Sequence, residues 1–284
     1  LYGDHRDLHL SIRRQRQMCI RDSNLSQSPH VLRDERTTFK LGRSPRKGEE
    51  IPRDMEYYFF TNLRDDVCGY FMAQTSDELC KMLDVSREDA DNFAALSHQR
   101  AENSIRNGIW EDEIVEVITP DGVLGSSHDD HVVIGTTIES LSGLRTHFGP
   151  DSLVTAGNAS GVVDGASAIV VKSAARAKSD GDSPLSRIIS WGIVGLDPKI
   201  MAHGPVPSSN LALQKAGLKV EDIDLWEINE AFAGQCVACI KDLGIDPSKV
   251  NVNGGAVGPV FYTHLRAHET REERGCRLLG DKKI

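Results

Sequence analysis

Apolar residues recur most regularly between residues 76 and 107, and their spacing predicts helix over this stretch. Ser86 and Asp89 resemble a capping box at the start of the main helix, with Asp in place of the usual Glu or Gln. Gly108 supplies a left-handed stop at the other end. The apolar positions that recur mainly at three- and four-residue spacing are Ala90, Phe93, Ala94, Ala101 and Ile105. They form one stripe, so the pattern indicates an amphipathic helix packed on a core.

The next segment combines a predicted strand with a polar loop. Residues 109–118 alternate acidic and apolar side chains, which predicts a strand. Residues 120–135 follow as a polar loop that contains His128-Asp-Asp-His131. Two histidines and two carboxylates are groups that can ligate a metal. Because a metal site also needs a rigid surrounding shell, which the neighbouring sequence does not offer, a solvated loop is favoured and no metal is predicted.

Strands and helices alternate from residue 152 onward. The strands are predicted at residues 166–171, 187–194 and 225–228. The first of them has the composition of a buried strand. Residues 206–216 are predicted to form a helix that starts near Pro207 and ends at Gly217. Because apolar strands alternate with helices, the sequence predicts a layered α/β fold.

The composition excludes several classes of protein. The 284 residues are 39% hydrophobic and 26% charged, which favours a folded chain of about two domains over a disordered one. No run of about 18 apolar residues occurs, and the first residues lack an export pattern, so neither a membrane span nor secretion is predicted. A net charge of −9 disfavours nucleic-acid binding. We therefore expect a cytoplasmic protein that binds neither membrane nor nucleic acid.

The two ends differ from the middle in charge and lack clear periodicity. Residues 1–23 and 261–284 each have a net charge of +2, whereas the residues between them total −13. One interpretation is a basic tail that contacts phosphate or membrane. The other is non-native sequence, because Arg13–Ser23 and Tyr262–Leu279 resemble translated sequencing adapters. We favour the second interpretation and leave residues 1–23 and 258–284 out of the reasoning about fold.

The cysteines do not form an evident framework. The six lie at positions 19, 68, 80, 236, 239 and 276, too few for a disulfide scaffold. Cys236 and Cys239 make a CxxC motif with no second pair, which is a weak zinc signal. Reduced cysteines in a cytosolic protein are the favoured interpretation, and metal or redox use is the alternative.

The stretch from Asp224 to Gln235 carries the most chemical information. An apolar strand runs into Asn229, and a helix is predicted from about Ala231. Strand ends that feed helix starts are the usual positions of sites in α/β folds. An Asn there can direct its amide N–H at a developing oxyanion, directly or through a water. Alternatively, Asn229 and Glu230 only cap the helix, and the pattern supports both interpretations equally.

A second turn of this kind ends the segment Lys249–Ala256. Gly254 and Gly255 permit a tight turn with positive φ. The segment matches neither GxGxxG nor a phosphate-binding loop, since no Lys-Ser or Lys-Thr follows. The sequence therefore gives dinucleotide binding little support.

Several motifs of the middle region, in order and spacing, resemble those of the thiolase family. They are Thr155-Ala-Gly-Asn-Ala-Ser-Gly161 with Asp164-Gly165, Gly195-Leu-Asp-Pro198 with Gly204-Pro-Val-Pro207, Asn229-Glu-Ala-Phe-Ala233, and Val250-Asn-Val-Asn-Gly-Gly-Ala256. The resemblance covers roughly residues 25–257. It implies a thiolase-like layered αβαβα fold of two similar halves, with an inserted loop domain that binds coenzyme A, and here the fold is incomplete. Residues 24–150 match the loop domain, 151–178 the end of the N-terminal half, and 179–257 the start of the C-terminal half.

The resemblance also implies acyl transfer between coenzyme A thioesters, with coenzyme A as a substrate and no cofactor. In the family one cysteine is the nucleophile, a second is the acid and base, and a histidine activates the nucleophile. Asn229 matches the residue that orients a water in the oxyanion hole, and Ser160 matches the one that hydrogen-bonds the pantetheine arm. The other positions that match coenzyme-lining residues are Ala156, Ala159, Ala231, Phe232, Ser140, Met72 and Leu63. Intact members are mostly homodimers or homotetramers.

The chain departs from the family at the catalytic positions. None of its cysteines has the Cys-Gly-Ser/Ala-Gly context of the nucleophile. Ala256-Val-Gly-Pro-Val-Phe261 replaces the run into Gly-His-Pro, so His264 is not the catalytic histidine, and Cys276 lacks the Gly-rich neighbourhood of the acid/base cysteine. Acetyl-CoA acetyltransferase is the leading expectation, with 3-ketoacyl-CoA thiolase or a non-catalytic acyl-CoA-binding relative as alternatives. We expect this chain itself to be inactive and to leave several apolar faces without partners.

Overall fold

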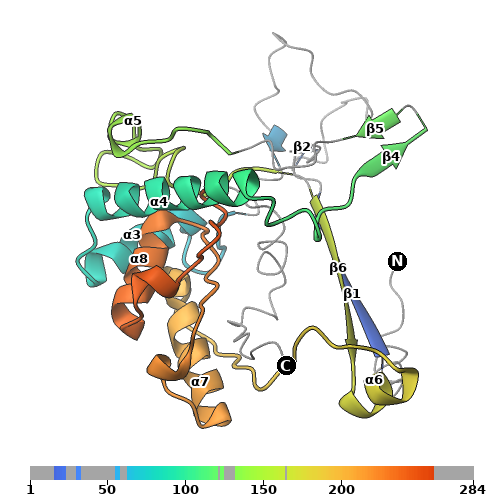
Figure 1. Cartoon of the computed structure of the whole chain (residues 1–284). Coiled ribbons are helices and arrows are strands. Elements are labelled where there is room, and N and C mark those ends of the chain that lie inside the picture. The colour runs from blue at the N-terminus through green and yellow to red at the C-terminus, as the bar shows by residue number, and fades with distance from the viewer. Residues whose placement is uncertain are drawn as a thin grey trace.

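The computed structural model describes residues 16–23, 30–32, 55–57, 63–120, 122–124, 132–163 and 165–258. Figure 1 shows a group of packed helices with a long, thin strand pair standing to one side. Three two-stranded antiparallel sheets are present in these segments. They pair β1 (Arg16–Ser23) with β6 (Gly165–Lys172), β2 (His30–Leu32) with β3 (Met55–Tyr57), and β4 (Val117–Thr119) with β5 (Gly122–Leu124).

The packed helices form what we call the helical body. Its members are α3 (Met72–Met82), α4 (Arg87–Arg106), the 3-10 helix η2 (Pro198–His203), α7 (Pro205–Ala216) and α8 (Ala233–Leu243). Helix α8 lies at the centre, in contact with α3, α4, η2 and α7. The larger buried side chains of this core include Leu79, Leu213, Ile223, Trp226, Ile228, Ile240, Leu243 and Ile245. The shorter helical elements are α5 (Ile138–Ser142), α6 (Ala174–Asp180), η3 (Val220–Asp222) and η4 (Pro247–Lys249), and α6 lies at the end of β6 (Figure 1).

Helix α4 begins at the capping box that the sequence predicts. The Ser86 Oγ accepts a hydrogen bond from the Asp89 backbone N–H at 3.1 Å, and the Asp89 carboxylate accepts one from the Ser86 N–H at 2.9 Å. The predicted helical stretch 76–107 is divided into α3 and α4 at this point, because Asp84 takes a left-handed conformation with φ of 51°. Gly108, with φ of 66°, ends α4 as predicted.

Helices α7 and α8 also follow the sequence closely. The predicted helix 206–216 is confirmed as α7, which ends at Gly217 with φ of 68°. Helix α8 begins at Ala233, two residues later than the predicted start near Ala231. The delay arises because Phe232 stays extended, with φ of −145° and ψ of 138°, and pairs with Ala159.

The strand predictions are only partly confirmed. Residues 166–171 do form a strand within β6, but that strand is not buried, since Val170 is 50% exposed. Its partner β1 lies in a segment whose sequence shows no periodicity. Residues 109–118 are mostly turn, with the Ile114 N–H bonded to the Trp110 carbonyl, and β4 occupies only the end of the range. The predicted polar loop contains β5, and His128–His131 lies outside the described residues.

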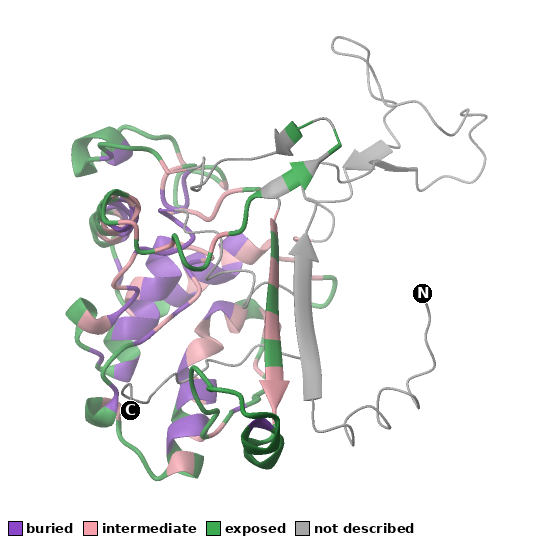
Figure 2. Cartoon of the chain, turned by 45° about the vertical axis from the view of Figure 1, so that its right-hand side comes forward, coloured by how far each residue is buried: buried purple, intermediate pink, exposed green. Residues whose placement is uncertain are grey.

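Two other predicted strands are not formed as strands in the described part of the chain. Residues 187–194 have no regular secondary structure, and residues 225–228 make one parallel bridge, between Trp226 and Val250. A strand needs a paired neighbour, so within the described segments the five-layer arrangement is not formed. Figure 2 shows the consequence, with burial concentrated in the helical body and exposure along β6 and α6. No helix of the described part is long and apolar enough to cross a membrane.

Candidate active site

Asn229 lies where an extended segment turns toward α8, as the sequence predicts. The Trp226 N–H bonds to the Lys249 carbonyl at 2.9 Å, and the Asn251 N–H bonds to the Trp226 carbonyl at 2.8 Å. These bonds hold the segment before Asn229 against the 249–251 segment. Asn229 itself is half-buried, and its carbonyl accepts a weak bond from the Cys236 thiol at 3.5 Å.

The interpretation of Asn229 and Glu230 as helix caps is wrong. The N-cap of α8 is Phe232, so both residues precede the cap. Glu230 is fully buried instead, and its carboxylate accepts three hydrogen bonds. The donors are the Ser97 hydroxyl at 2.7 Å, the Asn251 amide at 2.8 Å and the Val257 N–H at 2.9 Å. Glu230 therefore ties α4, the Asn229 turn and the 251–257 segment together.

The two neighbouring glycines make room for this carboxylate and for α4. A Cβ at Gly255 would lie 2.1 Å from the Glu230 carboxyl carbon. Gly254 adopts φ of 89°, as predicted for the turn, and a Cβ there would lie 2.7 Å from the Ala101 nitrogen. Burial raises the pKa of Glu230, although its three donors and Arg100 oppose that shift. The Gly-Gly pair thus serves close packing around a buried acid.

Two segments that the sequence separates by about seventy residues pair beside Asn229. The Ser160 N–H bonds to the Ala231 carbonyl at 3.1 Å, and the Ala233 N–H bonds to the Asn158 carbonyl at 2.9 Å. Between them, Ala159 and Phe232 form an antiparallel bridge. Four of the predicted coenzyme-lining residues, Ala159, Ser160, Ala231 and Phe232, are therefore neighbours in space.

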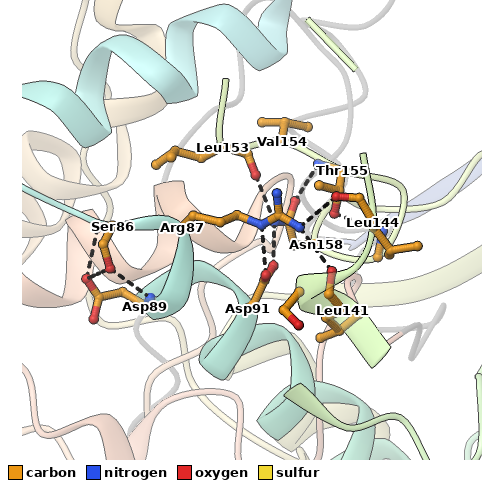
Figure 3. A network of polar contacts seen from close by, with 12 residues as sticks. Ser86, Arg87, Asp89, Asp91, Leu141, Leu144, Leu153, Val154, Thr155 and Asn158 are labelled. Carbon is orange, nitrogen blue, oxygen red and sulfur yellow. Dashed lines mark hydrogen bonds and ion pairs between the residues drawn. The ribbon is translucent and has the colours of Figure 1, made fainter. Parts of the chain in front are cut away.

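The turn that leads into Ser160 is shaped by Asn158, which is 2% exposed (Figure 3). Its Oδ1 accepts a hydrogen bond from the Thr155 N–H at 2.8 Å. Its Nδ2 donates to the Leu153 carbonyl and to Asp91 Oδ1, each at 2.9 Å. Ala156, another predicted lining residue, is exposed at the tip of this turn. The side chain of Asn158 therefore fixes a small-residue turn whose tip faces solvent.

The remaining predicted residues lie elsewhere. Leu63 and Met72 are adjacent, since the Met72 N–H bonds to the Leu63 carbonyl at 2.8 Å. Ser140 is exposed on α5, and its hydroxyl donates to the Thr137 carbonyl at 2.7 Å as part of a helix cap. The structure thus brings the Asn229 and Ser160 segments together, whereas Ser140 lies on the exposed surface of α5.

Comparison with known proteins identifies the family. The thiolase N-terminal domain profile matches residues 22–175, and the thiolase C-terminal domain profile matches residues 182–260. The chain belongs to the thiolase family. Acetyl-CoA acetyltransferase of Shinella zoogloeoides is 46% identical over 197 residues, which are 69% of this chain and 50% of that protein. This thiolase-family chain therefore spans about half the length of its bacterial relatives.

Solved thiolase structures match the coordinates as well. Human mitochondrial 3-ketoacyl-CoA thiolase superimposes with a TM-score of 0.78 at 36% identity, covering 92% of this chain and 66% of that one. The crystal structure of the same human enzyme in complex with CoA gives a TM-score of 0.78 over 89% of this chain. Acetyl-CoA acetyltransferase of Bacillus anthracis gives 0.74 at 36% identity, over 85% of this chain and 60% of that one. The thiolase-like fold is thus confirmed.

Two of the buried cysteines in this thiolase-family chain have a raised thiol pKa. Cys80, Cys236 and Cys239 are buried and Cys68 is partly buried, and none of the four is in a disulfide. Burial raises the pKa of the Cys80 thiol to about 11 and that of Cys236 well above its ordinary value. A nucleophilic cysteine needs the opposite shift, which stabilises its thiolate. Among the described residues, no group of three His, Cys, Asp or Glu side chains is placed to hold a metal.

Proposed function

We propose that this chain carries the coenzyme A-binding segments and the oxyanion asparagine of a thiolase acyl-transfer site. The observation that carries the proposal is the pairing of residues 158–160 with residues 231–233, directly beside Asn229. Small side chains in both segments let a thin pantetheine arm approach the backbone. Ser160, Ala159 and Ala156 would line that arm from one side, and Ala231 and Phe232 from the other.

Asn229 would act on the thioester carbonyl. A half-buried amide at a turn has little freedom to reorient, because hydrogen bonds on both sides hold its backbone. Such a fixed donor, directly or through one water, stabilises the negative charge that develops on the carbonyl oxygen during acyl transfer. Glu230 supports this role, because its buried carboxylate is bonded to Ser97 on α4 and to the Val257 N–H and so fixes the turn that carries Asn229.

We propose acetyl-CoA C-acetyltransferase as the activity of the intact protein, in line with the 46% identity to the Shinella enzyme. A 3-ketoacyl-CoA thiolase of fatty-acid β-oxidation is the second candidate. It is favoured by the match to human mitochondrial 3-ketoacyl-CoA thiolase, which at 38% identity extends over 93% of this chain. For the intact protein the family predicts a cytoplasmic homodimer or homotetramer.

We further propose the following division of the chain. Residues 24–150 are the coenzyme A-binding loop domain, 151–178 end the N-terminal half, and 179–257 begin the C-terminal half. The change from one family profile to the other between residues 175 and 182 supports the second boundary. By itself this chain would not transfer acyl groups, because none of its cysteines has the sequence context of the family's nucleophile, so the covalent route has no starting point. Burial also raises the pKa of the Cys80 and Cys236 thiols.

Calorimetric titration of the full chain tests the proposal. Coenzyme A should bind the wild type, and Ser160→Trp, which fills the proposed channel, should abolish binding. Asn229→Ala should weaken acetyl-CoA more than coenzyme A, because only the thioester offers a carbonyl to the oxyanion site. Asn210→Ala, at an exposed position on α7, is the matched control and should change neither affinity.

Two results would overturn the proposal. Equal affinities of the wild type and Ser160→Trp for coenzyme A would show that these segments do not form the coenzyme A site. Transfer of acetyl groups between coenzyme A esters by the purified chain would contradict the proposed inactivity. Such activity should then be traced by alkylation of the individual cysteines.

A further inference from the structure

One ion pair on α4 connects two of the segments that the proposed function assigns to coenzyme A. The Arg87 Nε donates to Asp91 Oδ2 at 2.7 Å, and the Asp91 side chain is only 2% exposed. The other carboxylate oxygen, Oδ1, accepts from the Asn158 Nδ2 at 2.9 Å. One oxygen of Asp91 therefore holds the arginine and the other holds the 153–160 turn, as Figure 3 shows.

The guanidinium of Arg87 extends the connection in the other direction. Its Nη2 donates to the Leu141 carbonyl at 3.0 Å and to the Leu144 carbonyl at 3.1 Å. These carbonyls lie at the end of α5, the short helix that carries Ser140. A planar guanidinium can satisfy a carboxylate and two carbonyls at once, and a lysine cannot reproduce that geometry.

The two segments also touch each other directly. A Cβ added at Gly157 would lie 2.5 Å from the Leu141 Cδ2 and 2.6 Å from the Leu144 Cδ1. A larger residue at position 157 would therefore push these two leucine side chains aside where the 153–160 turn passes the end of α5. The hydrogen bonds through Arg87 and Asp91 and this apolar contact both fix one distance. It is the distance between α5, which carries Ser140, and the turn that precedes Ser160.

An ordinary helix ion pair does not show this arrangement. Helix α6 has a pair of the same spacing, in which Arg176 Nε contacts Asp180 Oδ2 at 2.8 Å with the arginine 50% exposed. Such surface pairs contribute little to stability. Asp91 differs, because it is buried and divides its two oxygens between an arginine and a loop amide. A buried carboxylate without partners is strongly unfavourable. Asp91 therefore favours the arrangement in which Arg87 and Asn158 both stay bonded to it, and this arrangement fixes the 153–160 turn relative to α4.

We propose that Arg87 and Asp91 are positioning residues for the coenzyme A site. They set the distance between the α5 end, with Ser140, and the 155–160 turn, with Ala156, Ala159 and Ser160. The inference rests on the proposed function, since it assumes that these segments bind coenzyme A. Neither residue contacts the ligand in this scheme, and both act through Asn158 and the backbone of Leu141 and Leu144.

The test combines coenzyme A affinity with hydrogen exchange, measured by mass spectrometry on the full chain. Asp91→Asn keeps the size of the side chain but sets an amide N–H against the guanidinium. Arg87→Lys keeps the charge but not the planar fork. Each should weaken coenzyme A binding about tenfold, the effect of losing one charge-assisted hydrogen bond. Each should also lose exchange protection at residues 139–144 and 153–160, while α8 stays protected.

Arg176→Lys on α6 is the matched control and should leave both measurements unchanged. Unchanged affinity and protection in Asp91→Asn and Arg87→Lys would overturn the inference. Equal loss of protection over all helices, α8 included, would also overturn it, because the pair would then only stabilise the fold. If the wild type binds no coenzyme A, the proposed function fails, and local exchange at the two segments still decides whether the pair positions them.

Discussion

We call residues 165–194 the arm. Large apolar side chains are buried in the helical body, whereas similar side chains are exposed in the arm. Trp226 in the body is 2% exposed, whereas Trp191 in the arm is 61% exposed. The arm exposes further apolar side chains, namely Leu185, Ile188, Ile189, Ile193 and Val194. Both regions contain apolar runs, so the difference lies in what covers them. An apolar run shows which residues favour burial, and only a packed neighbour buries them.

The arm is nevertheless attached to the body at its far end. The Ser190 hydroxyl donates to the Ala212 carbonyl at 2.7 Å, and the Lys215 ammonium donates to the Trp191 carbonyl at 3.0 Å. Gly192 passes so close to α7 that a Cβ would lie 2.1 Å from the Ser208 carbonyl oxygen. The backbone of this segment is therefore held by α7, while its large side chains stay in solvent.

The tryptophan pair provides the largest expected contrast. Trp226→Ala should lower the free energy of unfolding by about 3–5 kcal/mol, because it opens a cavity in the core of the body. Trp191→Ala should change it by less than about 0.5 kcal/mol, since that side chain is already in water. Urea unfolding followed by circular dichroism measures both. Similar losses in the two variants would show that the arm is packed in solution.

A glycine pair tests the attachment of the arm. Gly192→Ala should cost about 1–3 kcal/mol, because its Cβ meets backbone that cannot move aside easily. Gly195→Ala has no atom within 4 Å of the added Cβ. It should be neutral or stabilise by less than about 1 kcal/mol, through the lower entropy of the unfolded chain. Thermal melts of both variants decide this, and equal melting temperatures would exclude the close approach to α7.

The buried acid of the body makes a prediction about pH. The pKa of Glu230 is raised above 4.5 in the folded state, mainly by burial. A group of this kind stabilises the fold fully below its unfolded pKa, and this contribution is lost as pH rises through the folded pKa. Relative to Glu230→Gln, the wild type should therefore lose free energy of unfolding as pH rises. The loss should be about 1.4 kcal/mol for each unit by which the pKa is raised.

The measurement is urea unfolding of the wild type and of Glu230→Gln, from pH values below the unfolded pKa of this residue to values above its folded pKa. A difference that instead grows in favour of the wild type with rising pH would mean that the donors from Ser97, Asn251 and Val257 outweigh burial. That result would assign Glu230 a depressed pKa.

The smallest effect on stability is expected from a charge placed in the arm. Ile193→Lys should leave the free energy of unfolding within about 0.5 kcal/mol of the wild type, since Ile193 is exposed. It should lower aggregation, because it interrupts a cluster of exposed apolar side chains. Light scattering during heating measures this, with Leu225→Lys, at an exposed leucine outside the arm, as the control. If both variants aggregate less to the same extent, the exposed apolar side chains of the arm are not the main cause of aggregation.

Local chemistry determined the helices well. The Ser86 and Asp89 pair, Gly108 and Gly217 mark helix ends that depend only on neighbouring residues, so the sequence predicted them and the coordinates confirm them. The strands were predicted less well. Residues 187–194 have the apolar composition of a strand, but a strand forms only when another chain segment pairs with it. Composition does not report whether that partner is in place.

For the candidate site, too, the sequence predicted the local features, and the tertiary structure was needed for the contacts between distant segments. The sequence placed Asn229 at a turn before a helix and identified the small residues around Ser160, because turn and helix signals are local. It did not show that Glu230 is fully buried, nor that Asp91 accepts a hydrogen bond from Asn158. Three donors from two separate segments, α4 and residues 251–257, satisfy the Glu230 carboxylate, and a carboxylate can be buried only when such donors converge on it. That convergence is a property of the tertiary structure, since residues 97, 230, 251 and 257 meet only after the chain has folded.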